Sequence, residues 1–317
     1  MSNKYEKLEK LKNGRINLRK LEENKTRYLG EDFSMKYIYK YKGENVYFKS
    51  NHEDAWNDYA EVYFYHLAKE LGIDALEYKL SSSGEEDGVI SFEFKKPGEK
   101  EMCFNEFIAR TLNENIKDAD FNYVSRAIDF NRKYKFTEGK IETKKKLLNS
   151  ILFDAVIMND DRHSANIVFL VDNKNNIRLA PLFDHGLSAG IIDAKDYADT
   201  DRPYNKKLDV SDDNIFKYDY NSDNTTDDIF KLFRFNRNTV TPFFKKYFDI
   251  DFSDLANKIE KEEGIVFPKR FKKYVSVVLN FRKKVILYKF KEKIKMVENS
   301  HDKSGLKEKY RELGQEI

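Results

Sequence analysis

The 317-residue chain has very little cysteine, and Cys103 is its one thiol. A single cysteine cannot form an intramolecular disulfide or supply a thiolate metal site, so both are excluded. The chain begins Met1-Ser2-Asn3-Lys4 without an apolar signal region, and no segment approaches the roughly 20 apolar residues that span a bilayer. We therefore expect no transmembrane segment and a cytoplasmic protein, for which secretion as an effector by a signal-independent route stays open.

An excess of one charge is also lacking. The chain has 58 Lys and Arg against 55 Asp and Glu, which leaves a formal net charge of +3. Charged residues make up 36% and aromatic residues 15%, a composition that indicates a folded chain with a charged surface over an aromatic core. The basic clusters at 269–273 and 282–284 fit a solvated helix face, so nucleic-acid binding is not expected.

Strand and turn patterns dominate the first third of the chain. Residues 1–28 predict a charged helix and a short strand, which we interpret as an N-terminal extension. Polar and Gly-containing turns then separate runs rich in β-branched and aromatic residues. The predicted elements are a hairpin over 37–49, a helix over 52–71 that is capped by Asn51 and ended by Gly72, and strands over 73–80 and 88–94.

Helical patterns dominate after the break at Lys95-Lys96-Pro97-Gly98, so we place a hinge between two lobes near Phe94–Gly98. The part beyond the hinge is expected to be mainly helical and to contain a second hairpin. The predicted elements are helices over 104–112, 118–131 and 142–158, strands over 167–171 and 177–179, and further helices within 227–296.

A polar run from Asn159 to Asn166 lies between the long apolar helix and the second hairpin, which ends at Asp184. Phosphoryl transfer needs a carboxylate that orients the acceptor, oxygen ligands for Mg²⁺ and a lysine on the nucleotide phosphates. The hairpin can bring Asn166 and Asp184 together on one metal ion. Asp161, which begins an Asp-x4-Asn pattern, would then face the acceptor hydroxyl.

Upstream of this loop, Lys49 ends a predicted strand and Glu61 lies on the helix that follows. This order matches the ion pair between a strand lysine and a helix glutamate in kinases. Lys49 would contact the α- and β-phosphates of a nucleotide, and Glu61 would hold the lysine. Glu44, Glu53 and Asp58 are alternative partners for Lys49.

The turn before the first hairpin lies where a loop that covers the phosphates is expected, although it lacks the Gly-x-Gly-x-x-Gly pattern. We assign Gly30 and Ser34 to this loop, and Phe94 at the hinge to nucleotide binding. By their location, Ser34 and Ser188 are candidate autophosphorylation positions.

Two segments carry a resemblance to a known family. Residues 159–166, Asn-Asp-Asp-Arg-His-Ser-Ala-Asn, and residues 179–186, Leu-Ala-Pro-Leu-Phe-Asp-His-Gly, resemble the catalytic and metal-binding segments of HipA-like kinases, especially the CtkA-type secreted Ser/Thr kinases. The helix that contains Tyr59-Ala60-Glu61 resembles the same family. The resemblance extends from about Leu29 to Gly190.

This resemblance implies a role for each matching position. The roles are Asp161 as the catalytic aspartate, Asn166 and Asp184 as Mg²⁺ ligands, Lys49 as the phosphate-binding lysine and Glu61 as its partner. Arg162 and His163 are further candidates for the site. Arg162 would either stabilise the transferred phosphate or pair with Asp160, and His163 would either fix the loop or take part in the chemistry.

The sequence therefore predicts an α+β, bilobal protein-kinase-like fold with an extension at 1–28, a β-rich N-lobe at 29–96 and a mainly helical C-lobe at 97–317. The expected reaction is transfer of the γ-phosphoryl group of Mg-ATP to a protein Ser or Thr hydroxyl. The expected partner is a protein substrate, and the family resemblance leaves an antitoxin or a host-cell target open.

Three alternatives remain at this point. The Asp-Arg-His string at 161–163 is shared with phosphoinositide kinases, so a lipid or small-molecule kinase is one of them. The missing Gly-rich signature leaves open a pseudokinase that binds nucleotide and acts as an interaction module. The third alternative is a metal-dependent hydrolase that uses Asp161, His163, Asp184 and His185 and has no need for Lys49.

Overall fold

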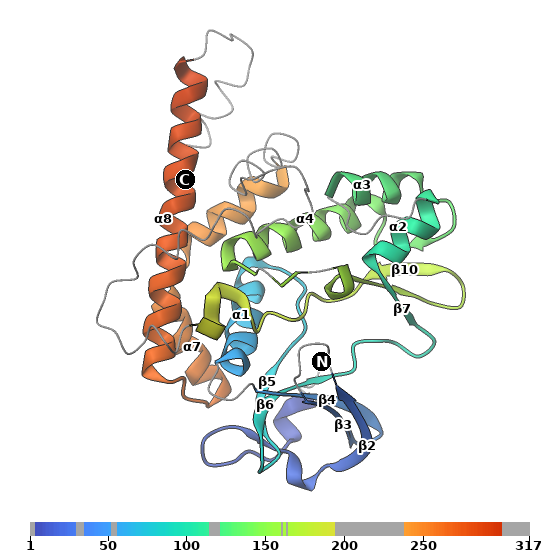
Figure 1. The fold of residues 1–317 in the computed structure, drawn as a ribbon, viewed down its shortest axis with the longest axis vertical. Coiled ribbons are helices and arrows are strands. Elements are labelled where there is room, and N and C mark those ends of the chain that lie inside the picture. Colours follow the sequence, from blue (N-terminus) through green and yellow to red (C-terminus); the bar gives the residue numbers. More distant parts are fainter. Residues whose placement is uncertain are drawn as a thin grey trace.

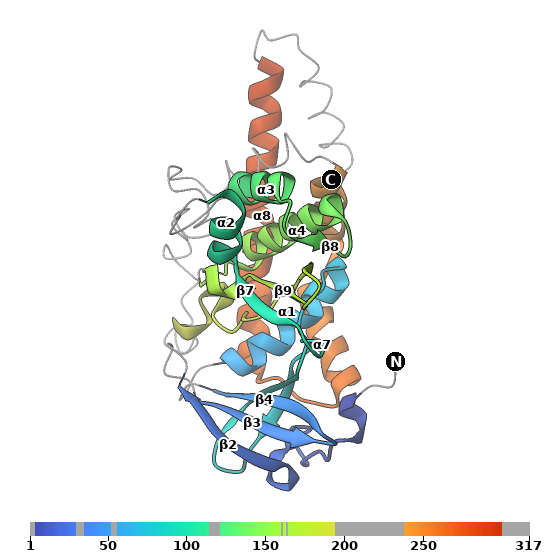
Figure 2. The ribbon, with the colours of Figure 1, turned by 90° about the vertical axis from the view of Figure 1, so that its right-hand side faces the viewer.

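The computed structural model describes residues 4–29, 35–51, 56–113, 121–159, 161–162, 164–193 and 238–299. A β-rich part lies at one end of the molecule and a mainly helical part lies above it, with the long helix α8 (Lys269–Asn299) along one side (Figure 1, Figure 2). The predicted α+β fold with a β-rich N-terminal lobe is confirmed.

Six strands form the N-terminal sheet in the order β1-β5-β6-β4-β3-β2. Their bounds are β1 Ile16–Asn17, β2 Glu22–Leu29, β3 Met35–Tyr41, β4 Glu44–Ser50, β5 Lys79–Ser82 and β6 Asp87–Phe92. β3 and β4 form the predicted hairpin, whose turn residues Lys42 and Gly43 both have positive φ, as a two-residue type I′ turn requires. β1 and most of β2 come from the segment 1–28, so this segment contributes to the sheet of the N-lobe. That lobe was predicted to begin at residue 29.

The helix predicted over 52–71 is α1 (Asn57–Leu71), and residues 52–55 lie outside the described residues. Gly72 ends α1 in the left-handed conformation, as predicted. The predicted start after Asn51 is wrong, because Trp56 is the N-cap and makes no side-chain capping bond. Its ring instead packs against Phe271 of α8, with the centroids 5.9 Å apart.

The strand predicted over 73–80 is confirmed only in its last part, where β5 begins at Lys79. The backbone before it pairs elsewhere, since Leu182 N–H donates to Asp74 O and Leu76 N–H donates to Leu182 O, each at 2.8 Å. This pairing joins the segment after α1 to the segment that leads to Asp184.

The helical part contains a second sheet in the order β7-β9-β10-β8. The predicted helices and the second hairpin are confirmed within the described residues, which do not include residues 118–120 of the helix predicted over 118–131, and the predicted hinge falls between β6 and β7. The bounds are β7 Lys100–Cys103, α2 Phe104–Leu112, α3 Phe121–Phe130, β8 Lys135–Phe136, α4 Lys140–Ile157, β9 Val168–Val171, β10 Asn176–Leu179 and α7 Phe252–Glu263. Residues 238–249 are also helical.

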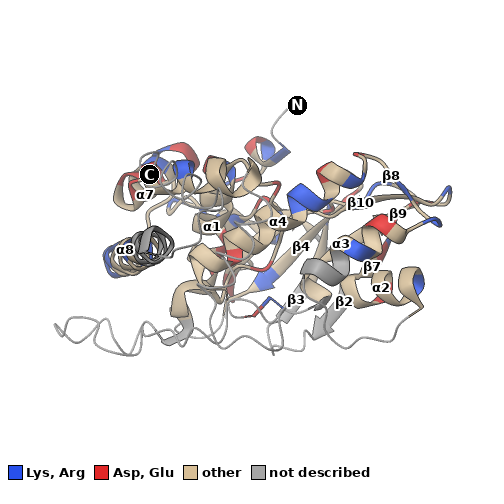
Figure 3. Cartoon of the chain, turned by 90° about the horizontal axis from the view of Figure 1, so that it is seen from above, with Lys and Arg blue, Asp and Glu red and all other residues tan. Residues whose placement is uncertain are grey.

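The charges of both signs are spread over the described helices and strands (Figure 3). Basic residues outnumber acidic ones along α8, the longest helix at 31 residues. Among the described residues, no helix combines the length and the apolar character that crossing a membrane would require.

Among the described residues, the two largest of three hydrophobic clusters form separate cores. The smaller one lies in the N-terminal sheet and includes Val46 and Phe48 of β4. The larger one joins α1 to α4, α7 and α8. Tyr63 of α1 is fully buried in it and donates to Phe252 O at 3.0 Å. α1 therefore packs in the core of the helical part, although it precedes the hinge in sequence.

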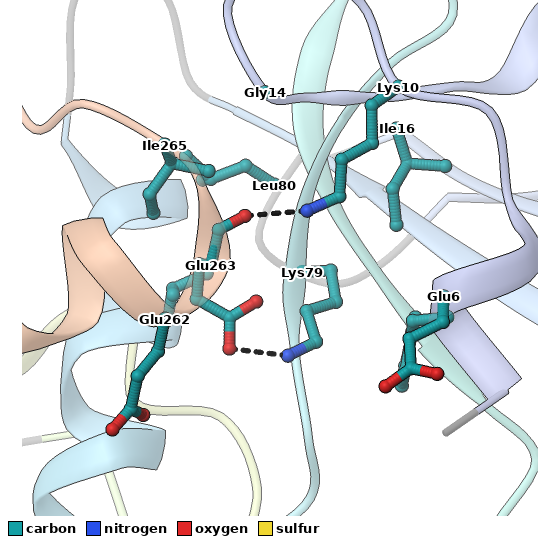
Figure 4. Close-up of a pocket in the computed structure, with 11 residues that line it drawn as sticks. Glu6, Lys10, Gly14, Ile16, Lys79, Leu80, Glu262, Glu263 and Ile265 are labelled. Atoms are coloured by element: carbon teal, nitrogen blue, oxygen red, sulfur yellow. Dashed lines mark hydrogen bonds and ion pairs between the residues drawn. The ribbon is translucent and has the colours of Figure 1, made fainter. Parts of the chain in front are cut away.

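The C-terminal end of α7 is tied to the N-terminal part at Glu263, to which Lys10 and Lys79 are each bonded (Figure 4), and His66 is a third partner. Lys79 Nζ and His66 Nε2 lie 2.6 and 3.0 Å from Glu263 Oε1, and Lys10 Nζ donates to Glu263 O at 2.5 Å. Gly14 has positive φ, and a Cβ there would lie 2.1 Å from Gly264 O, so the two backbones approach closely. A cavity of about 130 Å³ lies beside these contacts.

We predict that Lys79→Met weakens the pH dependence of stability in acid. Burial raises the pKa of Glu263, but His66 and Lys79 outweigh it and lower the pKa from 4.5 to about 2. The unfolded state therefore binds more protons in this range, so the contribution of Glu263 is complete above about pH 4.5 and is lost as the pH falls towards 2. At pH 7 the variant should lose about 1 kcal/mol of unfolding free energy.

Urea unfolding followed by circular dichroism at several pH values measures this change. Lys258→Met is the matched control, because Lys258 pairs with Glu70 on the surface and should leave the stability curve unchanged. The same acid dependence in Lys79→Met and in the unchanged protein would contradict the role given to this contact.

Candidate active site

Lys49 lies near the end of β4, where the N-terminal sheet faces the helical part. Its Nζ lies 2.6 Å from Asp184 Oδ1 and 3.3 Å from Glu61 Oε1. Three elements distant in sequence thus converge at one ammonium group. Burial would lower the pKa of Lys49, but the carboxylates of Glu61 and Asp184 raise it above its ordinary value, so this lysine stays cationic.

Gly88 lets β6 approach β4 at this lysine. A Cβ on Gly88 would lie 2.1 Å from the backbone O of Lys49 and 2.9 Å from the ring of Phe48. Any other residue would push the two strands apart at the point where Lys49 is held. From the sequence, Gly88 was predicted only to begin the strand over 88–94, and no role at the site was predicted for it.

Glu61 occupies the buried face of α1, and both of its carboxylate oxygens have partners. Oε1 accepts from Lys49, and Oε2 accepts the backbone N–H of His185 at 2.8 Å. A Cβ on Gly186 would lie 3.1 Å from Glu61 Oε1, which is closer than an ordinary contact. The segment 184–186 therefore packs directly against α1, and the predicted pairing of Lys49 with Glu61 is present.

Asp184 follows the second hairpin and has positive φ, at 65°. Aspartate tolerates this left-handed conformation better than most residues. Its backbone O accepts from Asn159 Nδ2 at 3.3 Å. Its side chain is 22% exposed, and its Oδ1 contacts Lys49.

The loop that carries Asp161 is held by amide side chains on both sides. Asn159 Oδ1 accepts the backbone N–H of Asp161 at 3.2 Å, and Asn166 Nδ2 donates to the backbone O of Asp161 at 3.0 Å. Asn166 lies in the short 3-10 helix Ser164–Asn166. Both bonds are made to the backbone of Asp161, so they hold the loop without engaging its carboxylate.

Arg162 is buried, with only 2% of its surface exposed. Its Nε donates to Asp154 Oδ2 at 2.9 Å and its Nη2 donates to Asp154 Oδ1 at 3.1 Å. Asp154 lies in the last turn of α4, and the sequence analysis did not single it out because an aspartate in a helix is usually solvated. The guanidinium therefore has a buried counter-ion within the fold.

His185 lies against the same guanidinium, with Nδ1 3.2 Å from Arg162 Nη2. Its ring packs at right angles to Phe153 at 5.4 Å. Burial and the charge of Arg162 lower the pKa of His185 well below its ordinary value, so the ring is neutral.

Tyr78 is a further residue that the sequence analysis missed. It is buried beside Lys49, Glu61 and Asp184, which together we call the Lys49 cluster. Burial and the charges of Glu61 and Asp184 raise the pKa of Tyr78 well above its ordinary value. Its hydroxyl therefore stays protonated next to the two carboxylates. No spacing in the sequence indicates this position, because Tyr78 lies between α1 and β5.

Four further residues that the sequence predicted for the site or for autophosphorylation are not placed in the site by the structure. Gly30, Ser34 and His163 lie outside the described residues. Ser188 is fully buried, which does not fit an autophosphorylation site.

Phe94 lies at the hinge, and its ring stacks on Phe183 with the centroids 6.1 Å apart. Both rings pack against a small apolar cluster made by Val168, Leu170 and Ala180. The backbone O of Phe94 accepts from Arg178 Nη2 at 3.0 Å.

The side chains suited to a divalent cation are those of Asn166 and Asp184. Among the described residues, no group of three or more His, Cys, Asp or Glu side chains is arranged to hold a metal ion. Since Asn166 Nδ2 donates to Asp161, its Oδ1 is the atom left for a cation. One amide and one carboxylate oxygen fit Mg²⁺, which proteins usually bind through few side chains together with phosphate oxygens and water.

Comparisons with solved structures show the fold. The crystal structure of the proinflammatory kinase CtkA from Helicobacter pylori matches with a TM-score of 0.66 and 20% sequence identity, over 87% of this chain and 96% of that one. A Shewanella oneidensis MR-1 complex of HipA, HipB and operator DNA also matches, with a TM-score of 0.46 and 14% identity, over 77% of this chain and 58% of that one.

No curated protein sequence matches the chain significantly. The family model described as the HipA-like C-terminal domain matches residues 17–242. The match covers well over half of the chain and includes every residue of the Lys49 cluster. It also begins before residue 29, in agreement with the place of β1 and β2 in the sheet. The chain therefore belongs to the family of HipA-like C-terminal domains and has the kinase-like fold of that family.

Proposed function

We propose that this protein is a kinase that transfers the γ-phosphoryl group of Mg-ATP to a serine or threonine hydroxyl of a protein. The contact of Lys49 with both Glu61 and Asp184 carries the proposal. A strand lysine, a helix glutamate and an aspartate after a hairpin are the groups that kinases bring together around the nucleotide phosphates. Membership of the HipA-like family supports the same reading.

Each residue has one task in this proposal. Lys49 binds the α- and β-phosphate oxygens, and Glu61 keeps the ammonium in place. Asn166 and Asp184 would hold Mg²⁺, which neutralises charge on the phosphates when it is bound. Asp161 orients the acceptor hydroxyl and accepts its proton as the oxygen attacks the γ-phosphorus and ADP leaves.

The nucleotide base is assigned to the hinge. The stacked rings of Phe94 and Phe183, with Val168, Leu170 and Ala180 beneath them, offer an apolar surface between the two lobes. A purine ring has a flat apolar face that suits such a surface. Gly30 and Ser34 remain assigned to the loop over the phosphates.

The acceptor class is tested directly by incubating the protein with Mg²⁺ and γ-labelled ATP, once with a mixture of proteins and once with phosphoinositide vesicles. We expect label on Ser or Thr residues of proteins. Label found only in lipid would overturn the protein assignment in favour of a lipid kinase. ATP binding without transfer to either class would point to a pseudokinase.

Asp161→Asn keeps the shape of the side chain but cannot accept the proton of the hydroxyl. We expect kcat to fall by about 100-fold or more, with a small change in the KM for ATP. Steady-state transfer to the protein acceptor measures both constants. Asp254→Asn, at an exposed aspartate of α7, is the matched control and should retain the full rate. Unchanged kcat in Asp161→Asn would remove Asp161 from the reaction.

Lys49→Met tests the phosphate-binding lysine. We expect kcat/KM for ATP to fall by about 100-fold or more, because the variant loses a cation aimed at the phosphates. Lys79→Met is a close control, since the side chain of Lys79 is 10% exposed against 15% for Lys49 and also pairs with a glutamate, 2.6 Å away, but outside this site. Similar losses in both variants would show that the effect of Lys49→Met is one of stability alone.

A further inference from the structure

Arg162 contacts the backbone at both candidate metal ligands. Its Nη1 donates to the backbone O of Asn166 at 3.2 Å and to the backbone O of Phe183, the residue before Asp184, at 2.5 Å. One nitrogen atom therefore joins the end of the catalytic loop to the end of the second hairpin. The β9–β10 hairpin already brings these two ends near each other, with Ala180 N–H donating to Val168 O at 2.8 Å, and Arg162 adds a direct link between them beyond the last bond of the hairpin.

The guanidinium is itself held in one orientation. Asp154 receives two parallel bonds from Nε and Nη2, at 2.9 and 3.1 Å. Such a bidentate pair fixes the plane of the guanidinium as well as its position. Arg162 and Asp154 are both nearly fully buried, so solvent cannot compete for these bonds. The fixed plane aims Nη1 at the two carbonyl groups.

Asn159 extends the same network to Asp161 and Asp184. Its Nδ2 lies 3.2 Å from Asp154 Oδ1 and 3.3 Å from Asp184 O, while its Oδ1 accepts the N–H of Asp161 at 3.2 Å. Met158, in the left-handed conformation at the end of α4, turns the chain so that Asn159 can return to Asp154. Asp154 is thus the common acceptor beside the loop.

We propose that Arg162, oriented by Asp154, is a positioning residue that sets the distance between Asn166 and Asp184 and so determines how tightly the site binds its divalent cation. This inference rests on the proposed function and assigns Arg162 no contact with the phosphate being transferred. Lysine cannot replace it, because an ammonium group lacks the planar arrangement of donors that reaches Asp154 and both carbonyls together.

The chain offers a matched control. Arg15 is also buried, donates from Nη2 to Asp58 Oδ2 at 2.7 Å, and donates from Nη1 to the backbone O of Ser81 and of Gly88 at 3.2 and 3.3 Å. Like Arg162, it pairs with a buried aspartate and with two backbone carbonyls, but these partners lie on α1 and in the N-terminal sheet. Arg15→Lys and Arg162→Lys should cost similar stability and differ in their effect on the metal.

The experiment measures Mn²⁺ binding to the full chain by electron paramagnetic resonance, in the presence of a non-hydrolysable ATP analogue. For Arg162→Lys we expect Mn²⁺ affinity to fall by about 10- to 100-fold, as is typical when a residue that orients metal ligands is lost. Binding of the analogue without metal should be retained, and Arg15→Lys should keep the original Mn²⁺ affinity.

Two failures can be told apart. If the unchanged protein binds the analogue no better with Mn²⁺ than without it, the proposed function fails. If it does bind Mn²⁺ but Arg162→Lys and Arg15→Lys have equal affinities, only the positioning role is overturned. Should Arg162→Lys not fold, Asp154→Asn provides the same test, because it leaves Arg162 in place but loosens its orientation; it should also weaken Mn²⁺ binding, and an unchanged affinity would overturn the inference.

Discussion

The carboxylate of Glu61 is the point at which the three parts of the candidate site meet. A buried carboxylate is unfavourable unless its charge and its oxygen atoms are paired. Glu61 obtains one partner from the sheet, the ammonium of Lys49, and one from the segment after the hairpin, the N–H of His185. Since α1 carries Glu61, neither the sheet nor the hairpin can shift away from α1 without leaving this charge unpaired.

A second buried ion pair, between Arg162 and Asp154, joins separate segments of the candidate site in the helical part. Arg162 and Asp154 lie beside the loop that carries Asp161, and Asn159 joins them to the backbone of Asp161 and Asp184. The two networks meet at the segment that begins with Asp184. The candidate site is therefore assembled on buried charges on both sides, and the side chains assigned to substrate and metal project from a backbone that is already fixed.

Local signals predicted much of the fold. Turn chemistry defined the β3–β4 hairpin, and helical periodicity found α2 and α4, because these elements depend on neighbouring residues. Long-range packing decided the rest. Trp56, at the start of α1, contacts Phe271, and Asp74 pairs with Leu182. Asp154 was missed for the same reason, since its partner is brought to it by a turn that no periodicity describes.

Because α1 belongs to the larger core, it is not free to move as a separate unit. Kinase-like molecules can be turned off by swinging the glutamate-bearing helix away from the lysine. Here that movement would pull Tyr63 from α7 and break packing with α8. The N-terminal sheet is bound to α1 as well, because Leu80 of β5 and Val89 of β6 belong to the same core as α1. A change of state that keeps Glu61 paired would therefore have to move α1 together with β4, which carries Lys49, and not α1 alone.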